Sequence, residues 1–408
     1  MFRISDFFKV NLLFLILTFS YVNLISKQFS YMGFKDDFNI ERFGVSLIFC
    51  VLVAIYYASV QEFFNKFIST LFLIFVIMPN LVLFSGMGGD IRIIIWCVLS
   101  LPITLFLLRI LPVIKLPVIK DKQVGALLWG LLILCIIPVL LAHGINFNLK
   151  VFLLDVYDIR RESRLANTMA SVYAYFWLAK VICPIALVYA IERKKIVMAM
   201  IFTLVLLYLF MTTGHKSVFF TVILIMVMYK GGMDYQKKSN YIFNGTLILF
   251  IFSILLTAIF SINILESLFI RRLLFIPALL NTYYFDFFDN KFVYYSSSYL
   301  SSIIDYPYDR PIPEVIGLNY FNSDEMSANN GYISDGFANA GSIGIFINIV
   351  LASILLKIFK DYDVNPKYAG LIFVSFYAIQ GSAMSTVLMT HGGILLLILV
   401  PMVLGRRK

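Results

Sequence analysis

Two adjacent arginines are the residues of this sequence best placed to do chemistry. Arg271 and Arg272 interrupt segment 264–285, which is otherwise nearly apolar enough to cross a membrane. Guanidinium groups bind phosphate oxygens through paired hydrogen bonds and stay charged at any accessible pH. Because two charges near the middle of an apolar helix cost several kcal/mol, the pair predicts a pyrophosphate contact and an interfacial or re-entrant helix. The alternative is ordinary anchoring to lipid headgroups.

A second cationic cluster consists of Arg160, Arg161 and Arg164. If this segment is helical, Arg160 and Arg164 lie one turn apart on one face and form a further candidate phosphate site. Acidic residues alternate with them: Asp155, Asp158 and Glu162. A solvated, salt-bridged helix face is therefore an equal alternative.

The tight turn Gly214–Ser217 separates two apolar spans and contains His215 and Lys216. A neutral histidine can accept a proton as a general base, and a lysine can hold an anion. A histidine at a membrane boundary is also often a simple interface residue, and His143 and His391 fall at similar positions. We take His215 as a candidate catalytic residue and Lys216 as a candidate substrate contact.

Two further ionisable positions complete the candidate set. Lys180 lies near the middle of the predicted span 168–190, too deep to reach the interface easily, and could meet substrate phosphates or form a structural ion pair. Several carboxylates could act as a general base, and the sequence ranks them poorly: Asp305, Asp309, Glu314, Asp324, Glu325 and Asp335. We carry Asp335 forward as the catalytic candidate.

The scaffold that positions these residues is a membrane protein. With 61% hydrophobic and 14% charged residues, the chain is too apolar for a soluble domain. A membrane helix needs about 20 apolar residues, which gives about twelve spans. They are 8–26, 43–60, 67–84, 91–108, 124–142, 168–190, 196–212, 217–229, 241–263, 341–358, 368–388 and 391–404. We expect an all-α polytopic fold in which residues 1–408 form a single integral membrane domain.

The distribution of charge, which sums to +10, indicates the orientation of the chain in the membrane. Most Lys and Arg residues fall in alternate segments that include both termini, and most Asp and Glu residues fall in the others, which is the positive-inside pattern. Both termini are therefore predicted to be cytoplasmic, and no nucleic-acid partner is implied. Two substantial loops lie on the outer face, a first loop at 143–167 and a large loop at 264–340.

The sequence offers no sign of a cofactor or metal. It contains no phosphate-binding loop, no dinucleotide-binding glycine motif and no HExxH pair. Four cysteines all fall inside apolar spans without a CxxC partner, so neither a disulfide framework nor a zinc site is predicted. We expect chemistry that needs neither a nucleotide nor a metal ion.

Several of these motifs together resemble the O-antigen polymerases (Wzy type). The similar parts are the stretches Arg271–Ala278 and Tyr283–Phe288, the Gly214–Ser217 turn, the Asn329–Gly344 return and the layout of spans with a late, long outer loop. The resemblance implies a metal-independent glycosyltransferase of the bacterial cytoplasmic (inner) membrane. It would join undecaprenyl-pyrophosphate-linked repeat units into a surface polysaccharide, an O-antigen or capsule, with membrane lipids and a chain-length regulator protein as partners. Family members often have a small residue and an arginine where this chain has His215-Lys216.

Two alternatives remain open. The related O-antigen ligases share the architecture but transfer the glycan to a lipid core. A polysaccharide-unit flippase or other secondary transporter would carry charged residues in several spans around a midplane cavity, whereas the sequence concentrates its charges in the outer loops.

Overall fold

The structure is a computed structural model that describes residues 3–145, 151, 156–232 and 234–405. Residues 146–150 and 152–155 of the predicted outer loop 143–167 lie outside the described residues, as do the extreme termini predicted to be cytoplasmic. Every regular element in the described part is helical, and 10 of the helices there are long and apolar enough to cross a membrane. The predicted all-α, multi-pass membrane fold is confirmed.

The predicted set of about twelve spans includes two helices that are too short for these criteria. Segment 217–229 corresponds to α12 (Lys216–Lys230), with 15 residues, and segment 368–388 begins as α17 (Ala369–Gly381), with 13 residues. A membrane crossing needs about 20 residues. The last long apolar segment, Met384–Leu404, combines the end of one predicted span with the whole of the next.

Contacts divide the chain into two compact units. Unit 1 comprises Met1–Ile110, Tyr235–Ser353 and Ile379–Met384, and unit 2 comprises the remaining residues. That they form a single membrane domain stays a prediction.

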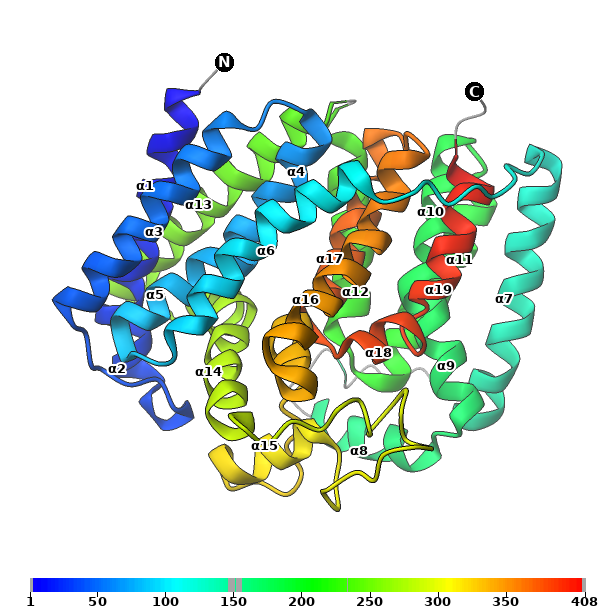
Figure 1. Cartoon of the computed structure of the whole chain (residues 1–408). Coiled ribbons are helices and arrows are strands. Elements are labelled where there is room, and N and C mark those ends of the chain that lie inside the picture. Colours follow the sequence, from blue (N-terminus) through cyan, green and yellow to red (C-terminus); the bar gives the residue numbers. More distant parts are fainter. Residues whose placement is uncertain (1–2, 146–150, 152–155, 233, 406–408) are drawn as a thin grey trace. The chain divides into compact units, whose positions relative to one another are not determined.

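Unit 1 contains most of the N-terminal helices, with α1 packed against both α3 and α13 (Figure 1). Its helices are α1 (Ile4–Ser20), α2 (Ser26–Gln28), α3 (Ile40–Ser59), α4 (Phe63–Phe72), α5 (Met78–Met87), α6 (Ile91–Ile110), α13 (Tyr235–Phe260), α14 (Ile276–Phe288), α15 (Ile312–Phe321) and the first part of α16 (Tyr332–Asp361). The π-helical turn Glu266–Phe275 leads directly into α14. The predicted outer loop 264–340 therefore contains substantial helix.

The core of unit 1 is the continuous helix Phe63–Met87, whose most apolar window is 100% buried. A π-helical turn, Leu73–Ile77, separates α4 from α5 and precedes Pro79. Proline has no N–H to donate to the carbonyl four residues earlier, so the helix must widen there. The Phe75 carbonyl instead accepts a hydrogen bond from Nε2 of Gln380 at 2.6 Å.

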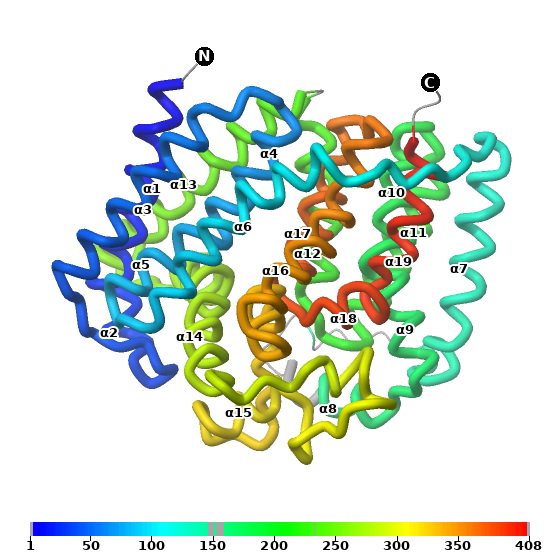
Figure 2. Tube along the Cα trace, viewed as in Figure 1, coloured from blue at the N-terminus to red at the C-terminus, as the bar shows by residue number. Residues whose placement is uncertain are grey.

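Helix α16 is broken near its start. Ala340 and Gly341 leave the helical conformation, and Gly341 has φ +57°. A Cβ on Gly336 would lie 2.6 Å from Ile345 Cα, so the short piece before the break packs closely against the helix after it. Figure 2 shows the change of direction in the orange trace. This close packing fixes the direction of the short piece of α16 before the break relative to the long helix after it.

Unit 2 contains α7 (Asp121–His143), α8 (Val156–Ala166), α9 (Met169–Trp177), α10 (Cys183–Glu192), α11 (Ile196–Thr213) and α12, together with the end of α16, most of α17, most of α18 (Met384–Leu388) and α19 (Gly393–Leu399). Its central helix is Met169–Glu192, of which 78% is buried in the most apolar window. The π-helical turn Leu178–Ile182 joins α9 to α10 and carries Lys180. Lys180 therefore lies on the most buried helix of its unit.

Candidate functional site

A basic pocket in unit 2 brings together three of the predicted site residues, Arg160, Arg164 and His215. The pocket encloses about 130 Å³. Its lining comes from α8, the start of the central helix and the turn between α11 and α12: Arg160, Ser163, Arg164, Asn167, Val172, Tyr175, Phe176, Thr213 and His215. No lining residue in the described part of the chain is acidic. The pocket has the charge to hold an anion.

Helix α8 supplies the two arginines. Arg160 and Arg164 are one helical turn apart, and both line the basic pocket. An Nη2 atom of Arg160 donates a hydrogen bond to the Gly214 carbonyl at 3.1 Å. This bond ties α8 to the turn that carries His215, so the arginines and the histidine are held on one small framework.

The turn between α11 and α12 fixes His215. Gly214 ends α11 with φ +67°, a conformation that favours glycine. Thr213, just before it, exchanges a 2.7 Å hydrogen bond with the buried Tyr175 hydroxyl. The His215 ring lies 6.0 Å from the Tyr175 ring and 6.3 Å from the Phe176 ring. The imidazole is therefore held against the central helix.

The surroundings of His215 keep its imidazole neutral. Burial, followed by the positive charges of Arg160, Lys180 and Arg164, lowers the pKa of His215 to about 4. At neutral pH the ring therefore carries one proton and one free lone pair. It can accept a proton, but its conjugate acid is destabilised while the pocket is empty.

Lys180 contacts a histidine that the sequence analysis left at the interface. Its Nζ lies 2.9 Å from Nδ1 of the buried His391 and 5.2 Å from the centre of the Phe176 ring. The Phe176 and His391 rings are 4.8 Å apart. Because Phe176 also contacts His215 and lines the basic pocket, it connects the part-buried Lys180–His391 pair to that pocket.

Two predicted substrate contacts in unit 2 lie outside the pocket lining. Lys216 is the first residue of α12 and is exposed, although it follows His215 directly. Arg161 is exposed on α8 between the two pocket arginines. The predicted basic set thus separates into residues that line the pocket and residues that do not.

Arg271 and Arg272 belong to unit 1 and have different surroundings. Arg271 donates to the Ser267 hydroxyl at 2.6 Å and lies 4.6 Å from the centre of the Phe29 ring. Arg272 is exposed. Neighbouring helical residues point in different directions, so the two guanidinium groups are not arranged as one fork. Their predicted contact with pyrophosphate stays a prediction.

Asp335 also belongs to unit 1, and its carboxylate accepts three hydrogen bonds. One oxygen accepts from Asn339 Nδ2 at 3.1 Å. The other accepts from Asn348 Nδ2 and from the Met384 backbone N–H, each at 2.9 Å. These bonds join both sides of the α16 break to the start of α18. The geometry gives Asp335 a structural task, and we leave it out of the proposed site.

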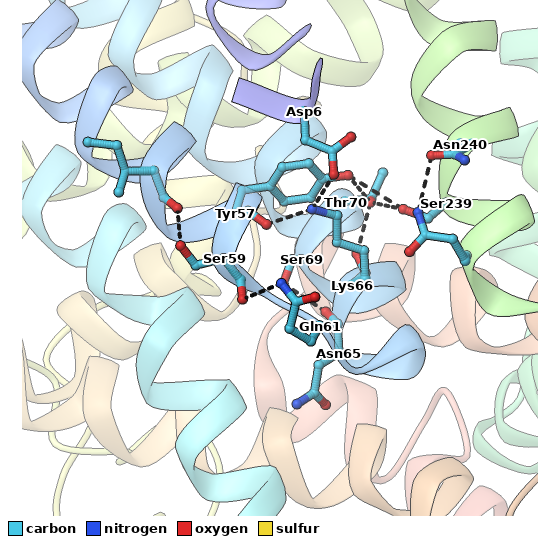
Figure 3. Close-up of polar contacts among 12 residues, drawn as sticks. Asp6, Tyr57, Ser59, Gln61, Asn65, Lys66, Ser69, Thr70, Ser239 and Asn240 are labelled. Carbon is cyan, nitrogen blue, oxygen red and sulfur yellow. Dashed lines mark hydrogen bonds and ion pairs between the residues drawn. The ribbon is translucent and has the colours of Figure 1, made fainter. Parts of the chain in front are cut away.

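A further ionisable cluster in unit 1 was not singled out in the sequence (Figure 3). Lys66 Nζ lies 2.7 Å from the Asp6 carboxylate, and both side chains are buried. The same ammonium donates to the Tyr57 carbonyl at 2.6 Å, and the Tyr57 hydroxyl bonds Thr70 at 2.9 Å. These contacts join α1, α3 and α4 near their ends and show a structural ion pair.

Sequence reasoning missed His391, Tyr175 and Phe176. Lys180 and His391 are 211 positions apart, and no spacing rule links a lysine to a histidine at that separation. Tyr175 and Phe176 lie in an aromatic run that is also typical of an interface belt. One signal was available, because a buried lysine requires a nearby acceptor.

No family model, curated protein or solved structure matches this chain. Within the described residues, no group of three or more His, Cys, Asp or Glu side chains is placed to hold a metal ion.

Proposed function

We propose that this protein is a glycosyltransferase that joins undecaprenyl-pyrophosphate-linked oligosaccharide repeat units into a surface polysaccharide. The reaction would take place at the outer face of the bacterial cytoplasmic membrane, with both termini on the inner side. The observation that carries this proposal is the basic pocket of unit 2, together with the Lys180–His391 pair behind Phe176. The resemblance to the O-antigen polymerases supports the choice of substrate.

The pocket fits the leaving group of such a transfer. Pyrophosphate carries several negative charges, and Arg160 and Arg164 offer planar donors that match its oxygens. Lys180 is half-buried behind Phe176, and its charge reaches His215, so it adds positive charge near the pocket. The positive charge of the pocket stabilises the negative charge that collects on the pyrophosphate as its bond to the neutral sugar breaks.

The transfer itself is a substitution at the anomeric carbon. An acceptor hydroxyl oxygen forms the new bond to that carbon, and the bond from carbon to the pyrophosphate oxygen breaks with its electron pair going to the pyrophosphate. The hydroxyl proton passes to the free nitrogen of His215, which acts as the general base. Bound pyrophosphate raises the basicity of His215, because a nearby negative charge favours the imidazolium.

Other predicted residues have secondary places in this proposal. Lys216, beside His215, and Arg161, beside the pocket arginines, would meet the charged headgroup as it enters. Arg271 and Arg272 stay a predicted phosphate contact of unit 1, considered by itself. Membrane lipids and a chain-length regulator protein are the expected partners.

The test is reconstitution. Purified protein in lipid nanodiscs is mixed with lipid-pyrophosphate repeat units, EDTA and no nucleotide, and the products are separated by size. We expect polymer from the wild type and none from Arg160→Ala or Arg164→Ala. Arg193→Ala is the matched control, because Arg193 is exposed and pairs with Asp121 at 2.8 Å, outside the pocket.

Three results would count against the proposal. Failure of the wild type to make polymer under these conditions would reject it. Activity that EDTA abolishes and a divalent ion restores would reject the metal-free mechanism. Transfer of single glycans to a lipid core acceptor, without polymer, would indicate a ligase.

A secondary transporter is the second candidate, because unit 1 contains more buried ionisable groups than the sequence analysis assumed. Glu266 is fully buried and accepts a hydrogen bond from the Ser253 hydroxyl at 2.8 Å, and Asp335 is buried beside the α16 break. Broken helices and buried carboxylates occur in transporters. Movement of a fluorescent lipid-linked glycan across proteoliposomes, without polymer formation, would support this candidate.

A further inference from the structure

An aromatic segment of unit 1, residues 292–309, lies outside the site described above. It connects α14 to α15 and carries two consecutive tyrosines in the left-handed region, Tyr294 with φ +51° and Tyr295 with φ +59°. Bulky residues rarely adopt this conformation, and such strain concentrates at functional sites. The left-handed conformation of these two tyrosines therefore needs a structural explanation and raises the question of a function.

The structural cause is a set of backbone hydrogen bonds to the end of the first piece of α16. The Val293 N–H donates to the Ala338 carbonyl at 2.9 Å, and the Tyr294 N–H donates to the Asn339 carbonyl at 2.8 Å. The Tyr295 N–H donates to Oδ1 of Asn339 at 2.9 Å. The strained turn is thus attached to a rigid helix end.

The rings are held in place as well. Tyr294 is 54% exposed and lies edge-on to Phe292, 6.3 Å between ring centres. Phe292 in turn contacts Phe337 at 5.7 Å, and Phe337 stacks on Phe285 at 3.7 Å. This series of rings fixes an exposed tyrosine against the core of unit 1. Tyr299, 47% exposed, extends the aromatic surface.

Tyr295 adds a polar group beside the exposed Tyr299 ring. The Tyr295 hydroxyl oxygen is buried without a hydrogen-bond partner in the described part of the chain, and its ring lies 6.1 Å from that of Tyr299. Burial, together with the charge of Asp335, raises the pKa of each of these two tyrosines to about 12. Both therefore stay protonated at neutral pH.

The segment and the two residues that adjoin it carry no net charge, because Lys291 and Arg310 flank it and Arg310 lies 3.7 Å from the Asp309 carboxylate. Residues 292–309 contain no lysine or arginine, and the charged residues there are Asp305 and Asp309. Five serines lie among the tyrosines: Ser296, Ser297, Ser298, Ser301 and Ser302. The segment contains no cluster of cations for a phosphate, and it offers ring faces and hydroxyls that suit a neutral ligand.

We propose that Tyr294, Tyr295 and Tyr299 form a binding site for a neutral saccharide. The exposed rings stack on the apolar C–H faces of pyranose rings, and the tyrosine hydroxyls hydrogen-bond the sugar hydroxyls. Tyrosine suits this task because it offers rigid contact area at a low cost in conformational entropy. The choice of a saccharide rests on the proposed function.

The strained backbone allows a sharp experiment. Tyr294→Gly removes the ring and its contact with Phe292 but also relieves the left-handed strain, so we expect the variant to fold. The probe is a set of neutral oligosaccharides, released by partial acid hydrolysis from the surface polysaccharide of the host bacterium. Binding is measured by saturation-transfer NMR on protein in nanodiscs, with empty nanodiscs as the blank, and the unfolding temperature is measured in parallel.

We expect Tyr294→Gly to weaken saccharide binding about tenfold without lowering the unfolding temperature. Tyr299→Ala should also weaken it. Tyr241→Ala is the matched control, because Tyr241 is 60% exposed on α13 and should leave binding unchanged. Equal binding by Tyr294→Gly and wild type, or no binding by the wild type, would overturn the proposal. So would reduced insertion into nanodiscs with unchanged saccharide binding, which would identify an interface anchor.

The polymer assay separates this proposal from the proposed function. Wild type that makes polymer while Tyr294→Gly binds saccharide normally would overturn the saccharide site alone. Wild type that binds saccharide through Tyr294 but makes no polymer would overturn the polymerase alone.

Discussion

The Nζ atom of Lys180 lies 2.9 Å from Nδ1 of His391, and both side chains contact the ring of Phe176. In this arrangement the lysine determines the histidine tautomer. When Lys180 is charged it can only donate, so Nδ1 must carry the lone pair and the proton must be on Nε2. The two residues therefore act as one unit behind the basic pocket.

A double-mutant cycle should reveal this coupling. Lys180→Met removes a cation behind the pocket, and we expect pyrophosphate binding, measured by calorimetry, to weaken about tenfold. His391→Leu leaves a buried ammonium without its acceptor, which lowers stability. The unfolding free energy of the double variant should exceed, by about 1 kcal/mol or more, the value obtained by adding the two single losses. Strictly additive changes in unfolding free energy would show that the two residues do not act together.

The pH dependence of catalysis should show two different acid limits. The plot of kcat/KM reports the free enzyme, in which the pKa of His215 is about 4. We expect kcat/KM to stay level as pH falls from 7 and to decline only near pH 4. The plot of kcat reports the enzyme with bound pyrophosphate, whose charge raises that pKa, so its decline should begin at higher pH.

The same group affects stability with a definite sign. Its folded pKa is below the value of about 6.5 expected for an unfolded chain, so the folded state binds fewer protons between these values. Stability is retained above about pH 6.5 and is lost as pH falls toward 4. His215→Asn should reduce this loss in thermal unfolding scans. An identical pH dependence in variant and wild type would exclude His215 as its source.

Part of the fold and of the candidate site could be predicted from the sequence, and part could not. Arg160 and Arg164 could be placed on one face from their spacing alone, and the all-α membrane class follows from composition. The partner of Lys180 could not be found, because tertiary packing brings together residues that no local pattern relates. The break in α16 at Ala340 and Gly341 and the attachment of Tyr294 and Tyr295 to Asn339 likewise depend on the folded loop.

Substitution of Asp335 can distinguish a structural role of this residue from a catalytic one. Asp335→Asn places an amide NH2 where two donors already converge, which should lower the unfolding free energy by about 1–3 kcal/mol. The reason is geometric, since the carboxylate accepts from Asn339, Asn348 and the Met384 N–H. The measurement is chemical unfolding in detergent. A fully stable variant with turnover lowered about 10²–10⁴-fold would instead identify Asp335 as the general base.

The arginine pair of unit 1 can be tested by substituting its members one at a time. If Arg271 binds pyrophosphate as a fork, Arg271→Ala should abolish polymer at normal protein abundance, and Arg271→Lys should restore only part of it. Arg271 also lies on the Phe29 ring and donates a hydrogen bond to Ser267. The unfolding temperature of the Arg271→Ala protein must therefore be measured alongside its activity. Arg272 is exposed, and Arg272→Ala should therefore fold normally. Loss of polymer in Arg272→Ala at an unchanged unfolding temperature would place phosphate chemistry at this pair. Full activity in both alanine variants would reject the predicted contact of this pair with pyrophosphate.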